Sequence, residues 1–101
     1  MRLVLTTCPD DKSQKLIDEI LKSKLVACVL DVCLSKSKFW WKNEIVEEKE
    51  SLIIFKTRKE LVKKLFKKIK ELHPYEVPFI SEIEVKKVNE EYMKWLKEVT
   101  K

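Results

Sequence analysis

The 101-residue chain contains no glycine. Phosphate-binding loops rely on glycine to bring backbone N–H groups close to the anion, so a nucleotide site of that kind is excluded. Only two of the 22 basic residues are arginine, the side chain that nucleic-acid readers use for bidentate base contacts. Most lysines instead alternate with glutamate on predicted helix faces, a pattern typical of hyperthermophile surfaces. The net charge of +5 therefore does not indicate a nucleic-acid partner.

Histidine and cysteine are also scarce. One histidine and three cysteines without C-x-x-C spacing indicate neither a disulfide framework nor a structural zinc site. No apolar run approaches the ~18 residues of a membrane-spanning helix, and the N-terminal run is too short for a signal peptide. There is no Ser/His/Asp set for nucleophilic catalysis. We therefore expect a cytoplasmic protein with reduced thiols, no membrane partner and no enzymatic activity.

Hydrophobic periodicity predicts a single domain over residues 1–101, in the order β-α-β-β-α-β with a further C-terminal helix. The expected strands cover residues 2–7, 26–41, 44–56 and 79–88, and the expected helices cover 12–24, 57–72 and 89–99. Capping boxes are expected for the first two helices, Asp11 with Gln14 and Thr57 with Glu60, and Asn89 is expected to cap the third. Right-handed crossovers place both long helices on one face of an antiparallel sheet, an α+β, ferredoxin-like arrangement.

Two features of these strands call for a partner. Residues 25–32, apart from Asp31, and residues 52–55 are apolar on both faces of the predicted strands, although helices are expected on one face only. The hairpin that turns at Lys42 and Asn43 is also long: residues 26–41 would extend about 50 Å, whereas a domain of this size is only about 33 Å across. Self-association would bury both the second apolar face and the projecting hairpin, with Trp40 and Trp41 as anchors near the hairpin tip.

The stretches KLVACV, FWWKNEIVEEKE, IIFKTR, ELHPYEVP and EEYMKWL follow one another in this order. Together they closely resemble the CutA family of divalent-cation tolerance proteins, over residues 4–96. The resemblance implies a ferredoxin-like fold assembled into a tight homotrimer, in which the long hairpins wrap neighbouring subunits. It also implies binding of copper or another divalent cation, with no organic cofactor and no firmly attached catalytic activity.

The resemblance extends to individual residues. The positions that match the family pattern are Cys28, Trp41, Lys56, Thr57, His73, Pro74, Tyr75, Pro78 and Trp95. Three positions depart from it. Phe79 stands where the family usually has glutamate, Leu30 where it commonly has asparagine, and Asn43 where it has the turn glycine.

His73 and Cys28 are the candidate metal ligands, because imidazole and thiolate both suit copper. They are too few for a closed site in one chain, so a trimer would have to add ligands. Each residue also has a structural interpretation. A protonated His73 ring would favour the negative end of the preceding helix, which Pro74 stops. Cys28 could serve as a small core residue.

A different interpretation uses Lys56, Tyr75 and Trp41. These residues could line a cleft between subunits that holds an anionic ligand or nucleotide, as in the nitrogen-regulatory PII trimers that share this fold. The discriminating observation is whether the trimer takes up metal or nucleotide; if it takes up neither, it is an interaction scaffold. The nearby carboxylates Glu47, Glu48 and Glu50 could bind hard cations. Because they alternate with Lys49, they are expected instead to form a solvated ribbon.

Overall fold

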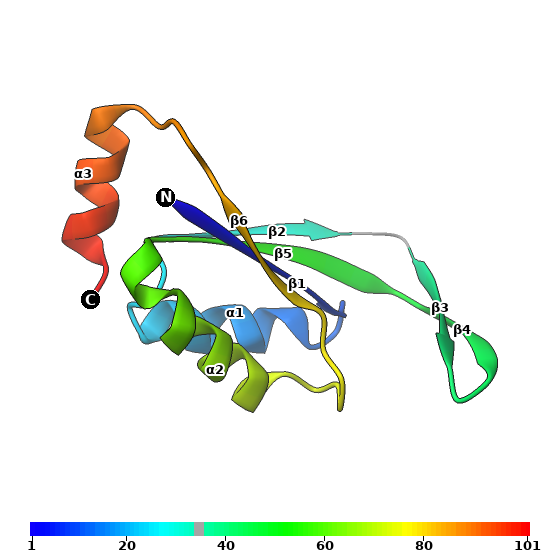
Figure 1. Ribbon diagram of the computed structural model, residues 1–101. Helices are drawn as coiled ribbons and strands as arrows, with labels where there is room; N and C mark the ends of the chain where they lie inside the picture. The colour runs from blue at the N-terminus through cyan, green and yellow to red at the C-terminus, as the bar shows by residue number, and fades with distance from the viewer. Residues whose placement is uncertain (34–35) are drawn as a thin grey trace.

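The computed structural model describes residues 1–33 and 36–101, and the predicted α+β class is confirmed (Figure 1). The strands are β1 (Arg2–Pro9), β2 (Cys28–Cys33), β3 (Ser37–Trp41), β4 (Glu44–Glu48), β5 (Glu50–Thr57) and β6 (Ile80–Glu84). The helices are α1 (Ser13–Lys22), α2 (Val62–Leu72), which follows a 3₁₀ turn at Lys59–Leu61, and α3 (Glu90–Val99). Within these described ranges, every helix is too short or too polar to span a membrane.

Four strands form one antiparallel sheet in the order β2-β5-β1-β6, and α1 and α2 cover one of its faces (Figure 1). The helix stripes predicted from periodicity account for this packing. Leu16, Ile17 and Ile20 on α1 are buried, as are Leu65 and Ile69 on α2. They meet the buried strand residues Val4, Cys8, Ile53 and Phe55, and Val26 before β2, in one core. Each such side chain contributes about 1.5–3 kcal/mol by leaving water.

The other face of the sheet, which we call the open face, is also apolar. Side chains alternate along a strand, so the residues opposite the helix-covered positions point the other way. The apolar ones are Leu3, Leu5, Leu30, Val32, Leu52, Ile54 and Ile83. In the described single chain, Leu30, Val32 and Ile83 remain 43%, 42% and 46% exposed. The sequence-based expectation that this sheet has two apolar faces is confirmed.

Strands β3 and β4 form a separate two-stranded ribbon that projects past the end of the helices (Figure 1). The molecule measures 46 Å along its longest axis and only 24 and 20 Å along the others. Lys42 and Asn43 form the predicted turn, and both have positive φ, 51° and 66°, as a two-residue hairpin turn requires. The predicted continuous strands are interrupted, however. Lys36 lies outside a strand before β3, and Lys49 separates β4 from β5. The part of the predicted strand at residues 34 and 35 lies outside the described residues.

The predicted capping of α1 and α3 by side chains is wrong. Helix α1 begins at Ser13 without a side-chain cap, and the Gln14 amide donates to Asp18 one turn along the helix instead of reaching back to Asp11. Asn89 does stand at the N-cap position of α3, but its amide contacts Glu91 and caps no helix N–H.

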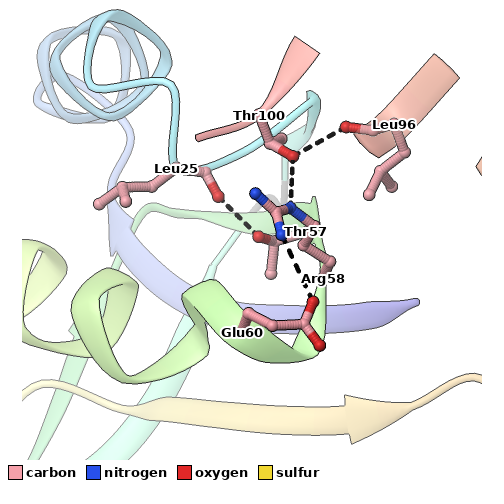
Figure 2. Close-up of polar contacts among 6 residues, drawn as sticks. All are labelled: Leu25, Thr57, Arg58, Glu60, Leu96 and Thr100. Carbon is pink, nitrogen blue, oxygen red and sulfur yellow. Dashed lines mark hydrogen bonds and ion pairs between the residues drawn. The ribbon is translucent and has the colours of Figure 1, made fainter. Parts of the chain in front are cut away.

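The capping box expected at Thr57 is also wrong, because both of its members have other partners (Figure 2). The buried Thr57 hydroxyl donates a 2.6 Å hydrogen bond to the carbonyl of Leu25. Glu60 pairs with Arg58 at 3.5 Å. A 3₁₀ turn therefore precedes α2 in place of the sharp capped start that the local sequence predicted.

The C-terminal helix is held to the body by its last residues (Figure 2). The Arg58 Nε–H donates to the Thr100 hydroxyl oxygen at 2.9 Å, and this hydroxyl donates to the Leu96 carbonyl at 2.8 Å. Leu96 is fully buried, and the Lys101 N–H donates to the Lys24 carbonyl at 3.0 Å. Helix α3 is thus anchored at its C-terminal end by one apolar side chain and a short chain of hydrogen bonds.

Candidate functional site

The only histidine of the chain ends α2, and its ring is engaged on both sides. His73 is 8% exposed; its Nε2 lies 2.7 Å from the Thr7 carbonyl, and its Nδ1 lies 3.0 Å from the Tyr75 backbone nitrogen. A carbonyl only accepts and a backbone N–H only donates, so the ring is neutral with its proton on Nε2. Burial lowers the pKa of His73, against the Thr7 hydrogen bond and the charge of Glu50, which both raise it. The protonated ring predicted for this helix end is therefore wrong, although the helix does stop before Pro74.

Glu50, the first residue of β5, is a buried carboxylate with two hydroxyl donors. It is 4% exposed; Oε2 accepts a 2.7 Å hydrogen bond from the Tyr75 hydroxyl, and Oε1 accepts from the Ser37 hydroxyl. Burying a carboxylate is costly unless such donors replace water. The expectation that Glu50 is solvated is wrong for this reason. Burial, followed by the hydrogen bond to Glu50, raises the pKa of Tyr75, so its hydroxyl stays protonated and able to donate.

These contacts link four separate segments of the chain. Ser37 belongs to β3, Glu50 to β5 and Thr7 to β1, whereas His73 and Tyr75 belong to the connection between α2 and β6. We call these five residues the hinge cluster, since they lie where the ribbon meets the body of the molecule. The His73 and Tyr75 rings are also in contact, with centroids 5.2 Å apart.

A groove of about 760 Å³ lies between the ribbon and the connection that follows α2. Aromatic side chains line much of it: Phe39, Trp40, Trp41, Tyr75 and Phe79. Three carboxylates also line it, Glu48, Glu50 and Glu76, against a single lysine, Lys38. We call this feature the ribbon groove. Its lining favours apolar or cationic groups over anions.

The structure brings together only two of the three residues predicted to form a ligand cleft. Trp41 and Tyr75 both line the ribbon groove. Lys56 lies outside it in the same chain, where its Nζ is 3.3 Å from the Tyr92 hydroxyl on α3 and 5.2 Å from the centre of that ring. A cleft that contains all three residues would need Lys56 from another subunit.

The two predicted metal ligands lie apart in one chain. Cys28 pairs with Lys56 across the sheet, whereas His73 contacts Thr7, whose partner on β5 is Leu52. Lys56 is four residue steps along the strand from Leu52, about 13 Å. Over residues 1–33 and 36–101, no group of three or more His, Cys, Asp or Glu side chains could hold a metal ion. A metal site shared between subunits stays a prediction.

Sequence reasoning missed Glu50, Ser37 and Thr7 as members of one cluster. The one local signal was that Glu50 directly precedes SLIIF, a strand segment that is mostly apolar. A carboxylate beside such a segment is carried toward the interior and needs donors there. Those donors come from residues 13 and 25 positions away, which local patterns do not connect.

The model of the CutA1 divalent ion tolerance protein family matches residues 2–99. The chain belongs to this family. It is 45% identical over 102 residues to the divalent-cation tolerance protein CutA of Pyrococcus horikoshii, covering 100% of this chain and 99% of that one. A crystal structure of CutA1 from Pyrococcus horikoshii matches with a TM-score of 0.94 at 44% identity, covering 100% of this chain and 99% of that one. A structure described as the PII-like protein CutA of Nostoc sp. PCC 7120 matches with a TM-score of 0.93 at 30% identity, covering 100% and 98%.

The resemblance stated from the motifs is therefore confirmed, as is the α+β fold shared with CutA1 and PII-like structures. The names of these relatives refer to tolerance of divalent cations or to PII-like proteins, not to a reaction.

Proposed function

We propose that this protein is a non-enzymatic, ferredoxin-like homotrimer that acts in divalent-cation tolerance by binding a divalent cation, with copper as the first candidate. Family membership supports the tolerance role. The observation that supports assembly is the apolar open face, because an uncovered apolar sheet of this extent is typical of an interface. A reducing compartment, the cytoplasm, suits the three free thiols.

A closed ring of copies suits the geometry of the sheet. Its two outer strands, β2 and β6, lie on opposite edges and differ in length and sequence. Contacts between one edge and the different edge of the next copy are head-to-tail, and such contacts form a ring when the rotation between copies closes. Three copies arranged in this way would bury their open faces against one another, and each projecting ribbon would reach a neighbour.

For the cation, the geometry favours Cys28 over His73. Cys28 is half-buried on β2, on the same side of that strand as Leu30 and Val32 of the open face, where copies of the chain would meet. Thiolate is a soft ligand that suits copper, and thiols from several subunits could supply the ligands that one chain lacks. The His73 ring, in contrast, has its Nδ1 lone pair and its Nε2 proton already in use.

Calorimetric titration of the metal-free protein with Cu(I), Cu(II) and Zn(II) tests this proposal. We expect saturable copper uptake that is lost in Cys28→Ser and retained in Cys33→Ser, the matched control on the same strand. Copper uptake that persists in a Cys28→Ser, His73→Ala double variant would reject both predicted ligands.

The second candidate is a small molecule held in the ribbon groove. The groove volume of about 760 Å³ and the aromatic pair Trp41 and Tyr75 favour it, as does similarity to a protein described as PII-like. The acidic lining disfavours an anion unless the partner subunit's Lys56 completes the cleft. Titration with a nucleotide panel separates the candidates: nucleotide binding without copper uptake supports this second function. A protein that binds neither is better regarded as an interaction scaffold.

A further inference from the structure

The ribbon joins the body at a defined pivot. At Lys49, between β4 and β5, the backbone leaves regular strand pairing. The Lys49 carbonyl accepts a 3.1 Å hydrogen bond from the Asp10 N–H, and the Asp10 carboxylate accepts a 2.7 Å hydrogen bond from the Ser51 hydroxyl. Asp10 therefore holds both Lys49 and Ser51 to the body, although the ribbon beyond Lys49 lies in a different sheet.

Next to this pivot, Glu50 connects the ribbon to the body through its two oxygens. Oε1 accepts from Ser37, the first residue of β3, and so contacts the ribbon itself. Oε2 accepts from Tyr75, which belongs to the body. On the body side, Tyr75 is held in turn, because its N–H donates to His73 and the His73 ring donates to the backbone of β1.

Every buried polar side-chain atom of the hinge cluster has a hydrogen-bond partner. Among the described residues, no buried side-chain nitrogen or oxygen lacks a hydrogen bond. A buried, charged acceptor that depends on two hydroxyls has few alternative geometries, because moving either donor leaves a carboxylate oxygen unsatisfied. The position of Ser37 relative to Tyr75 is thus set by a single carboxylate.

We propose that Glu50 is a latch that fixes the angle between the ribbon and the body, and that the ribbon pivots at Lys49 when Glu50 loses either Ser37 or Tyr75. The latch also shapes the ribbon groove, since Ser37, Glu50 and Tyr75 all line it. This inference does not depend on the proposed cation binding. It concerns the direction in which each chain presents its ribbon to a neighbour.

Distance measurement between paired spin labels tests the latch. One pair joins the ribbon tip to the body, with Asn43→Cys and Lys67→Cys in a Cys28→Ser, Cys33→Ser background. A second pair within the body, Lys15→Cys and Lys67→Cys, reports on general loosening. Labelled chains are refolded with an excess of unlabelled chains, so that each assembly carries one labelled pair.

We expect a narrow ribbon-to-body distance distribution in the protein with native Ser37 and Tyr75. It should broaden or shift in both Tyr75→Phe and Ser37→Ala, while the pair within the body is unchanged. Tyr92→Phe, which removes a hydroxyl outside the cluster, should leave both distributions unchanged. A distribution that Tyr75→Phe and Ser37→Ala leave unaltered would overturn the proposal. Equal broadening of the pair within the body would overturn it too, because it would show a general loss of packing.

Discussion

The Tyr75 hydroxyl donates a 2.7 Å hydrogen bond to the Glu50 carboxylate, and this contact ties the connection after α2 to the first residue of β5. It gives a structural reason for the unusual composition of that connection. The sequence HPYEVP places a histidine, a tyrosine and two prolines between α2 and β6. The prolines restrict the backbone, and the two polar rings connect β1 to the buried carboxylate.

Replacing Tyr75 with phenylalanine should destabilise the protein. The variant keeps the ring but leaves Glu50 Oε2 without its donor, so the free energy of unfolding should fall by about 1–3 kcal/mol. Denaturant titration at one fixed protein concentration measures this change. Tyr92→Phe is the matched control, because its hydroxyl meets Lys56 rather than a buried carboxylate. An equal loss in both variants would contradict the role given to Glu50.

The stability of the protein should fall in mild acid because of His73. Burial lowers the pKa of this ring from its ordinary value of 6.5, so the unfolded chain takes up a proton at a higher pH than the folded one. The stabilising contribution of the neutral ring is complete above pH 6.5 and is lost as the pH falls from there toward the folded-state pKa. Melting temperatures between pH 8 and 5.5 should decline more steeply in the wild type than in His73→Gln. Equally steep declines of the melting temperature in the two proteins would show that the His73 ring does not contribute to the pH dependence of stability.

The sequence predicted correctly those parts of the fold that depend on residues close together in the chain. The turn at Lys42 and Asn43 follows from a short polar break between two strand-like runs, and the stripe of Leu16, Ile17 and Ile20 follows from helical spacing. The sequence did not indicate that Lys42 as well as Asn43 would adopt positive φ, nor that Lys24 would do so after α1. In a chain without glycine, these residues accept a conformation that costs about 1 kcal/mol each.

Patterns failed where distant segments recruit a side chain. Thr57 and Glu60 have the spacing of a capping box, but the Thr57 hydroxyl binds the distant Leu25 carbonyl and Glu60 pairs with its neighbour Arg58. The sequence around Glu50 and Lys49 predicted a solvated carboxylate, whereas the fold places the Ser37 and Tyr75 hydroxyls within hydrogen-bond distance of it. The same limit applies to the candidate site, since residues that line one groove came from segments with no common motif.

A charge placed on the open face should prevent assembly. Leu30→Lys would bury a lysine between subunits in the proposed trimer, and desolvation of that charge opposes association. Leu21→Lys is a matched control: Leu21 is 41% exposed, close to the 43% of Leu30, but it lies on α1. Sedimentation velocity should show smaller or aggregated species for Leu30→Lys only. An unchanged sedimentation coefficient for Leu30→Lys would place the interface elsewhere.

The anchor of α3 should depend on one hydroxyl. Thr100→Val keeps the shape of a residue that is 5% exposed but removes the partner of Arg58 and the donor to Leu96. We expect a loss of about 1–2 kcal/mol and faster amide hydrogen exchange across residues 90–99. Thr100→Ser retains the hydroxyl and should exchange at nearly the wild-type rate. Equal exchange in the two variants would mean that packing of Leu96 alone holds the helix.

Native mass spectrometry of the protein reconstituted with copper tests the central claim most directly, since it reports assembly and metal content in one spectrum. The claim that a homotrimer binds a cation through Cys28 predicts a species of three 12.1 kDa chains that carries copper. The Cys28→Ser variant should give the same trimer without the metal. A folded monomer of 12.1 kDa at micromolar concentration, or a trimer that takes up no copper, would contradict the claim.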